Sequence, residues 1–431
     1  MNTYNKFIPM VLLLLFLTSC HTNQNKITNM GDYNPYLEIT ENKTLQKANE
    51  ELNFWEEKLE KEPGQYPYLA KVAGAQGQLF HVTGNIDYLI KAEESFIQVN
   101  EKTNYQQSGY LRSLARNYIS QHKFKEALEL LKKAETHGDN LKGTQKMLFD
   151  VYLELGNYDV AKTYLYKIKD VSDYDYLIRL SKWSDHQGDL QAAIKYMEQA
   201  LAISEASKVD GFMQWSYTNI ADFYGHNGEI EKSYTYYLKA LALNPDDAYA
   251  KKGIAWIVYS YEKNPEEALR ILNSISANHQ APDYYLFKAE IAEYQNNMDE
   301  SSENLNQYFK AVANSKYGNM YNKYNAILYA EDLQKLESAL QIANTEINNR
   351  PTPQSYDLLA WTYYKKQNYV KALAIAEEYI VNKTFEPEAL YHLAKIYKAN
   401  GKMAEAEGLK KELLESTFEL GPVMERDIQK I

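Results

Sequence analysis

The chain has 431 residues and a formal net charge of −11, from 47 basic and 58 acidic residues. Its lysines and glutamates alternate along most of its length rather than forming the dense basic stripe that phosphate tracking requires, so nucleic acid is not an expected partner. Glycine (18) and proline (11) are few, while Ala, Leu, Glu and Lys recur throughout, which favours helices and short turns over a sandwich or barrel.

The first twenty residues are typical of an export signal. Lys6 precedes an apolar run at 7–17, which is as long as a signal-peptide core and too short to span a bilayer. The sole cysteine, Cys20, follows in Leu17-Thr18-Ser19-Cys20, which resembles the lipobox of bacterial lipoproteins. The resemblance implies that 1–19 is a lipoprotein signal peptide and that Cys20 is lipidated. Each buried methylene contributes about 0.8 kcal/mol, so more than one acyl chain anchors a protein stably.

The residues after the cysteine indicate a location and a tether. His21 stands where lipoproteins retained in the inner membrane commonly carry Asp, so the resemblance implies the outer membrane. Residues 21–31 hold no acidic cluster like the surface-export tag of Bacteroidetes-type lipoproteins. This favours the periplasmic face, with cell-surface exposure as the alternative. The polar stretch 20–44 is predicted to be a tether.

Beyond position 45 the sequence repeats itself. Small residues recur in pairs twelve apart, and the second members of these pairs follow one another at intervals of 32 to 40 residues. Two antiparallel helices approach closely only where both carry a small side chain, and twelve residues cross the turn between them. One degenerate unit is placed on Ala339, which makes ten units. The pairs are Ala115/Ala127, Ser181/Ala193, Ala221/Ser233, Ala289/Ser301, Ala360/Ala372 and Ala394/Ala406, and Phe149 and Trp256 replace the first member before Ala161 and Ala268.

Turn residues support the same reading. Glycine followed by a polar residue recurs between the two small positions, and glycine readily adopts the left-handed conformation that ends a helix. These glycines are Gly156, Gly188, Gly228 and Gly401. Each unit is therefore predicted to be a helix, a cap and a second helix.

The chain here resembles the tetratricopeptide repeat family, most clearly over 217–245, and the likeness extends over roughly 66–420. The resemblance implies an all-α fold, a right-handed superhelical solenoid of about ten tetratricopeptide-like helix pairs with a concave face built from the first helices. We expect an N-terminal solenoid with its capping helix at 45–349 and C-terminal repeats with a cap at 350–431. Consecutive X-Pro bonds at 349–353 predict a hinge between them.

The predicted repeat register places particular side chains on the concave face, among them Asp222, His226, Glu290 and Glu293. Arg112 and Arg116 lie one turn apart, a spacing suited to holding a carboxylate. Trp361, Tyr364 and Tyr391 form an aromatic hot-spot candidate, and packing between repeats is the alternative role for these rings. The residues predicted to bind a partner are Arg112, Arg116, Lys182, Asp222, Trp361, Tyr364, Tyr391 and Lys395.

No motif for chemistry appears in the chain. There is no His-Glu-x-x-His, phosphate loop or nucleophile elbow, and the Ser-x-x-Lys at 120–123 falls at a predicted turn. We therefore expect no catalytic residue, no metal and no cofactor. The expected function is a non-catalytic, membrane-tethered scaffold that binds a protein or peptide in its groove. The alternative is a carbohydrate-binding outer-membrane lipoprotein similar to the SusD family.

Overall fold

The structure, a computed structural model, describes residues 26–38, 42–332 and 334–431. These residues form 23 α-helices and two short helices of other types, and no strand occurs among them. Ahead of the repeats stand α1 (Met30–Leu37) and α2 (Lys43–Lys61), and the chain ends in α23 (Thr417–Ile428). Between them lie ten consecutive pairs: α3 (Tyr66–Thr83) with α4 (Ile86–Lys102), α5 (Ser108–Ser120) with α6 (Phe124–His137), α7 (Leu141–Glu154) with α8 (Tyr158–Lys167), α9 (Tyr174–His186) with α10 (Leu190–Ser207), α11 (Asp210–His226) with α12 (Ile230–Leu243), α13 (Ala248–Trp256) with α14 (Pro265–Ser276), α15 (Asp283–Tyr294) with α16 (Met298–Val312), α17 (Asn322–Glu331) with α18 (Leu336–Asn349), α19 (Pro353–Lys365) with α20 (Tyr369–Tyr379), and α21 (Pro387–Ala399) with α22 (Met403–Glu415).

The helices of each pair pack against each other at the small residues that the sequence repeats. Every second member of the twelve-residue pairs is buried, in the degenerate eighth unit as in the others, and Ser181 Oγ donates a hydrogen bond across its pair to the Ala193 carbonyl at 2.7 Å. These second members are Ala92, Ala127, Ala161, Ala193, Ser233, Ala268, Ser301, Ala339, Ala372 and Ala406. The prediction of an all-α superhelical solenoid of ten helix pairs is confirmed.

The four predicted turn glycines adopt the left-handed conformation, with φ between 74° and 77°. Two of them also lie where another part of the chain comes very close. A β-carbon on Gly156 would lie 2.9 Å from the Pro351 carbonyl oxygen, and one on Gly188 would lie 2.7 Å from the ring of Phe385. Glycine at these turns therefore permits a packing contact in addition to the helix cap.

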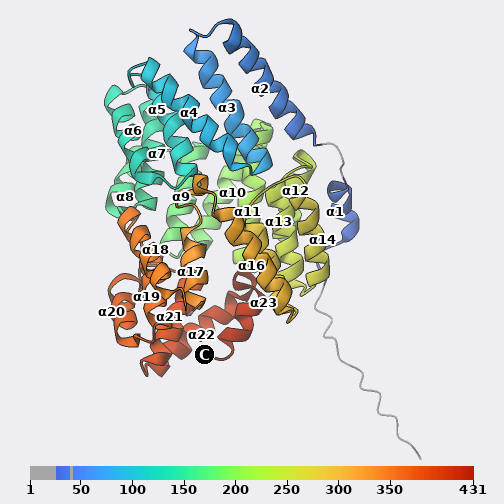
Figure 1. Cartoon of the computed structure of the whole chain (residues 1–431), viewed down its shortest axis with the longest axis vertical. Helices are drawn as coiled ribbons and strands as arrows, with labels where there is room; N and C mark the ends of the chain where they lie inside the picture. Colours follow the sequence, from blue (N-terminus) through green and yellow to red (C-terminus); the bar gives the residue numbers. More distant parts are fainter. Residues whose placement is uncertain (1–25, 39–41, 333) are drawn as a thin grey trace, which may run out of the picture.

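Those contacts arise because the superhelix returns on itself. The Gln280 amide donates to the Thr83 carbonyl at 2.7 Å, and Arg350 forms an ion pair with Glu154 at 3.3 Å. Arg350 and Glu154 are 196 residues apart in sequence, and the other contacts have a similar separation. Turns within the early repeats thus contact loops between the later repeats. Figure 1 shows α18 to α21 lying against the ends of α6 to α9.

The segment at 349–353, predicted to be a hinge, is packed inside this contact. Thr352 is buried, and its hydroxyl accepts a hydrogen bond from the Ser355 amide at 3.3 Å, which caps α19. Ser355 Oγ in turn donates to the Arg350 carbonyl at 2.7 Å. The prolines do end α18 at Asn349, as expected. Hinge motion at this segment stays a prediction.

A π-helix, η1 (Ile257–Tyr261), follows α13 in the unit where Trp256 replaces the small residue. The wider π turn commonly marks a functional or strained position in a helix. Here it accompanies the docking of the C-terminal helix, because Trp256 Nε1 and Ser260 Oγ both donate to the Phe418 carbonyl, at 2.9 and 2.6 Å. The large residue that departs from the repeat pattern therefore binds α23.

Part of the predicted tether is folded. Helix α1 packs on α12 and α14, on the outer side of the solenoid (Figure 1). Tyr33 is buried, and its hydroxyl donates to Glu267 at 2.6 Å, while the Thr28 amide donates to Glu262 at 2.6 Å. The polar composition of 20–44 gave no sign of this docking, in which Tyr33 is buried and Ile27, Tyr36 and Leu37 pack against the same core. Cys20 and the signal peptide at 1–19 lie outside the described residues.

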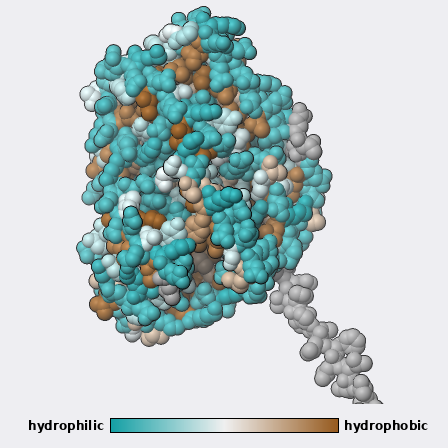
Figure 2. Space-filling model, in the orientation of Figure 1, coloured by the Kyte–Doolittle hydropathy of each residue, from teal (hydrophilic) through white to brown (hydrophobic). Residues whose placement is uncertain are grey.

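The face drawn in Figure 2 is largely hydrophilic, with hydrophobic patches between the helices. In the described part of the chain, no helix is both long enough and apolar enough to cross a membrane.

Candidate functional site

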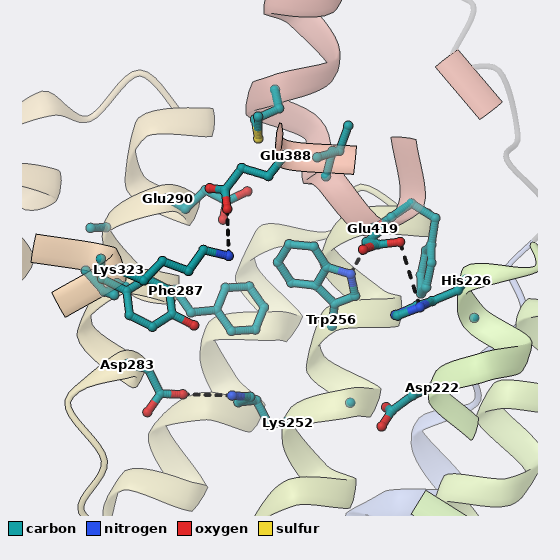
Figure 3. Close-up of a pocket in the computed structure, with 18 of the residues that line it drawn as sticks. Asp222, His226, Lys252, Trp256, Asp283, Phe287, Glu290, Lys323, Glu388 and Glu419 are labelled. Carbon is teal, nitrogen blue, oxygen red and sulfur yellow. Dashed lines mark hydrogen bonds and ion pairs between the residues drawn. The ribbon is translucent and has the colours of Figure 1, made fainter. Parts of the chain in front are cut away.

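Inside the superhelix lies a cavity of about 600 Å³ that is partly open to solvent. The inner helices α11, α13, α15 and α17 supply most of its lining, and residues of α12, α16, α23 and the start of α21 complete it. Figure 3 shows charged and aromatic side chains from these elements converging on one space. A pocket of this size with convergent polar groups is the expected form of a ligand site.

The lining follows from helical spacing on the inner face. Asp222 and His226 lie four residues apart on α11, as do Lys252 and Trp256 on α13. Residues four apart in a helix share one face, so each inner helix presents two of its long side chains to the same space. These are first helices of their repeats, as the concave register predicts.

Two lysines in the cavity are paired with carboxylates. Lys252 Nζ lies 2.7 Å from Asp283, and Lys323 Nζ lies 2.7 Å from Glu388 (Figure 3). Burial acts to raise the pKa of the Glu388 carboxyl, but Lys323 outweighs it, so that the pKa is lowered. Each pair joins two different repeats. The pairs therefore hold the wall of the cavity together and also contribute to its charge.

Five further carboxyl groups line the cavity: Asp222, Glu290, Glu293, Glu386 and Glu419. Asp222 accepts hydrogen bonds from the hydroxyls of Tyr237 and Tyr249, and Glu290 accepts one from Tyr259 at 3.2 Å. Burial raises the pKa of all five carboxyls, that of Glu290 to about 8. Burial, which removes water from the carboxylate, is the main cause in each case, and neighbouring carboxyls add to it for the four glutamates.

An aromatic and aliphatic wall faces these carboxyls. Trp256 and Phe287 have ring centroids 5.1 Å apart, and α23 adds Phe418, Leu420 and Met424. Helix α23 contacts α11, η1 and α15, and its Lys263–Glu425 ion pair at 2.7 Å holds it in place. The cavity therefore combines negative charge with a large apolar surface.

The predicted Arg112 and Arg116 pair does not present two cations to one ligand. Arg112 is largely buried and donates to the Asp139 carbonyl at 2.8 Å and to Thr144 Oγ1 at 3.1 Å. Its burial lowers the pKa of the guanidinium, while Asp139 acts in the opposite direction. Arg116 is exposed. The two arginines do lie one helical turn apart, but the Arg112 guanidinium forms its hydrogen bonds with the next repeat.

Lys182 also contacts its own chain. Its Nζ lies 2.9 Å from Glu154, the carboxylate that Arg350 reaches from the later turn of the superhelix. Burial acts to lower the pKa of Lys182, and Glu154 more than compensates, so the pKa is raised. Of the eight predicted residues, Asp222 is the one that lines the cavity.

The predicted aromatic hot spot packs between repeats. Trp361 is 3% exposed and Tyr391 is 8% exposed. The Trp361 ring stacks on His392 and on Tyr364, with centroid distances of 4.0 and 4.8 Å, and its Nε1 donates to Glu331 at 3.2 Å. Lys395 is half-buried near Tyr391, and burial lowers the pKa of its amine. The structure brings these four predicted residues together: Trp361 and Tyr391 belong to the core, Tyr364 packs against it, and Lys395 lies beside Tyr391.

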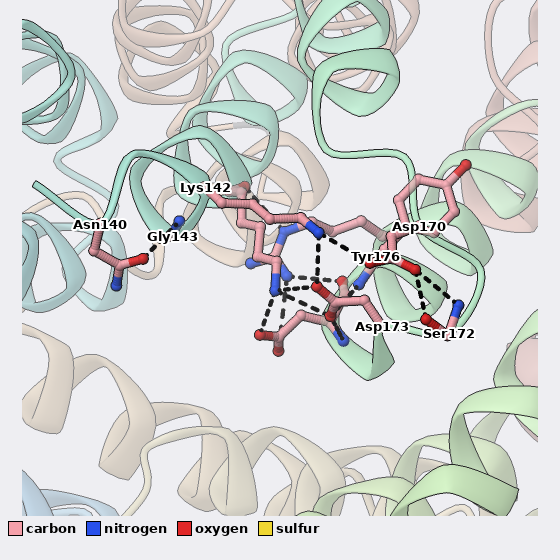
Figure 4. A network of polar contacts seen from close by, with 10 residues as sticks. Asn140, Lys142, Gly143, Asp170, Ser172, Asp173 and Tyr176 are labelled. Carbon is pink, nitrogen blue, oxygen red and sulfur yellow. Dashed lines mark hydrogen bonds and ion pairs between the residues drawn. The ribbon is translucent and has the colours of Figure 1, made fainter. Parts of the chain in front are cut away.

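A second polar cluster joins α7 to the start of α9 (Figure 4). Lys146 Nζ lies 2.8 Å from Asp173 and 2.9 Å from Asp175, and Arg179 lies 2.6 Å from Asp150. Each positive group has a carboxylate partner. The cluster thus links neighbouring repeats and leaves no charge unmatched for a ligand.

Sequence reasoning missed the lysines, the C-terminal helix and the aromatic wall of the cavity. It did place Asp222, His226, Glu290 and Glu293 on the concave face. No local signal marks the covering helix, because its position depends on the pitch of the whole superhelix. In the described ranges, no group of three or more His, Cys, Asp or Glu residues is arranged to hold a metal ion. The charged and aromatic lining of the cavity is suited to binding a ligand.

Residues 174–207 and 216–247, which cover α9, α10, α12 and most of α11, match the model of the tetratricopeptide repeat family. No curated protein matches the chain. Among solved structures, a tetratricopeptide repeat protein from Parabacteroides merdae is 18% identical over 56% of this chain and 93% of its own, with a TM-score of 0.34. A human IFIT1 dimer with m7Gppp-AAAA is 14% identical over 76% of each chain, with a TM-score of 0.46. A Rap protein complexed with competence and sporulation factor is 13% identical over 63% of this chain and 88% of its own, with a TM-score of 0.44.

Proposed function

We propose that this protein is a non-catalytic scaffold that binds a segment of a protein or peptide partner in its internal cavity. The observation that carries the proposal is that seven carboxyl groups and an aromatic wall converge on one space of about 600 Å³ inside a chain otherwise occupied by repeats. Tetratricopeptide repeats commonly serve as protein-binding modules. The cavity lies on the concave face, where the later repeats and α23 narrow the predicted groove to a partly open pocket.

The proposal includes a membrane tether. The lipobox-like sequence ending in Cys20 supports lipidation at the outer membrane, on its periplasmic face. The docking of α1 against α12 and α14 fixes the base of such a tether on the outer side of the solenoid. Metabolic labelling with an alkyne-bearing fatty acid should mark the wild type and leave Cys20→Ser unmarked and released from membranes. A Cys20→Ser protein that stays in the membrane fraction would remove the tether from the proposal.

A carbohydrate-binding role is not carried forward. Such proteins interrupt a helical scaffold with long loops that hold the sugar, whereas the ten described helix pairs follow one another through short turns. No feature of the cavity favours a neutral polyhydroxylated ligand over a charged one.

Site-specific photocrosslinking in cells tests partner binding. A photoreactive phenylalanine analogue at Tyr324, which lines the cavity and is 42% exposed, should trap one specific protein or peptide. The matched control is the same analogue at Tyr166, which is 66% exposed and does not line the cavity. Equal adducts from both positions, or none from Tyr324, would refute binding in the cavity.

A further inference from the structure

The charge of the cavity is unbalanced. Its lining carries seven carboxyl groups against two lysines and one histidine, and each lysine is already paired. Within the described chain, no lysine or arginine forms an ion pair with the remaining five: Asp222, Glu290, Glu293, Glu386 and Glu419. His226 lies 3.8 Å from Glu419, which is an ion pair only when the imidazole is protonated. The cavity therefore lacks positive charge relative to its carboxyls.

Desolvation makes this imbalance costly. Several carboxyls share one small space from which much of the water is excluded, so their ionised forms repel one another. The raised pKa of Glu290 and of its four neighbours reflects that cost. A cation in the cavity would favour the ionised form of the carboxyls around it, whereas an anion would add to their repulsion.

The apolar part of the lining restricts the kind of cation. Trp256, Phe287 and Phe418 present aromatic surface, and Leu420 and Met424 extend it. An apolar stem would displace water from this wall, and aromatic faces attract ammonium and guanidinium groups. A bare metal ion has no apolar surface and would make no contact with this wall. Solvent reaches the site, since the Lys323 side chain is 47% exposed although it lines the cavity.

We infer that the cavity binds one alkylammonium or guanidinium group carried on an apolar stem, with the stem against Trp256 and Phe287 and the charge among the carboxyls that have no lysine or arginine partner. This inference rests on the proposed function, in which the group is a lysine or arginine side chain of the partner. The same chemistry occurs in free alkylamines, which the test separates.

The test compares ligands with and without the ammonium group. Calorimetry on the folded wild-type protein would use acetyl-Gly-Lys-Gly-amide and its uncharged analogue, in which norleucine replaces lysine and the terminal ammonium is absent, with hexylamine as the free-amine probe. Hydrogen bonds from a charged group contribute about 1.5–3 kcal/mol, so the lysine peptide should bind about 10- to 150-fold more tightly than the norleucine peptide. Equal binding of the two peptides would overturn the inference. Tighter binding of hexylamine than of the lysine peptide would support the chemistry and assign it to a free amine.

Variants locate the binding. Glu290→Gln combined with Glu419→Gln should weaken lysine-peptide binding at least 10-fold. Glu407→Gln combined with Glu412→Gln removes the same two charges from exposed positions on α22 and should leave it unchanged. Equal losses in both double variants would contradict binding in the cavity. A partner that crosslinks at Tyr324 but binds both double variants equally would refute the cation inference alone, whereas amine binding without any crosslinked partner would refute the proposed function alone.

Discussion

Replacing Gly421 by alanine should detach the helix that covers the cavity. Gly421 has φ 81° and ψ 167°, a conformation that is essentially limited to glycine. A β-carbon there would lie 2.5 Å from Glu290 Oε1 and 3.1 Å from the Trp256 ring. The side chain of Glu290 can move, but the indole is held by its hydrogen bond to the Phe418 carbonyl. The substitution therefore strains the backbone and also presses on the wall of the cavity.

The expected magnitude comes from those two terms. Backbone strain of this kind costs of order 1–3 kcal/mol, and loss of the Trp256 hydrogen bond adds about 1 kcal/mol. A total of about 2–4 kcal/mol corresponds to a reduction of about 30- to 1,000-fold in the protection of α23 amides from hydrogen exchange. Mass spectrometry measures the protection from hydrogen exchange helix by helix, and NMR measures the exchange of the Trp256 indole proton.

Gly401→Ala is the matched control for Gly421→Ala. Gly401 also has a positive φ, 77°, but a β-carbon there would meet nothing within 4 Å. Its cost should be about 1 kcal/mol and confined to the turn between α21 and α22. If Gly421→Ala leaves α23 as protected as in the wild type, or lowers protection no more than the control does, α23 does not cover the cavity as described.

Three further substitutions test separate parts of the structure. Trp361→Ala should lower the free energy of unfolding by about 3–5 kcal/mol in urea titrations, because the ring is core; a loss below about 1 kcal/mol would mean that the ring is a surface contact. Glu290→Gln should change the pH dependence of stability: with a folded pKa of about 8 against an ordinary 4.5, the wild type binds more protons folded than unfolded and loses stability as pH rises from about 4.5 to 8. The variant should therefore gain up to about 3 kcal/mol relative to the wild type at pH 7 and almost nothing at pH 4, and a pH-independent difference would contradict the burial of that carboxyl. Tyr33→Ala should deprotect the amides of α1 in hydrogen exchange without affecting α12 or α14, and unchanged protection would show that Tyr33 does not hold α1.

The repeat could be predicted because it is local. Ser181 and Ala193 face each other across one turn, and their small size is needed whatever the rest of the chain does. The same reasoning recovered the eighth unit from Ala339, although little else in that unit matches the pattern. It also placed Glu290 on the concave face, since that depends on the helix register alone.

The closure of the superhelix could not be predicted in the same way. Contacts such as Arg350 with Glu154 depend on small rotations accumulated over almost two hundred residues, and no single repeat specifies their sum. Once the later turn covers the groove, concave residues become core or cavity lining. The aromatic residues show this most clearly, because the apolar ring of Trp361 suits an interface and a core equally well until its neighbours are known.

Zero-length carbodiimide crosslinking tests the closure most directly, because it joins a lysine to a carboxylate only where they touch. With 14N- and 15N-labelled protein mixed to separate links within one molecule from links between two, the account predicts isopeptide bonds within one molecule between Lys316 and Asp87 and between Lys263 and Glu425, whose atoms lie 2.6 and 2.7 Å apart. Lys182 with Glu154, in adjacent repeats, serves as the positive control. Recovery of the adjacent-repeat link without the two long-range links would show that the solenoid is open and would contradict the account.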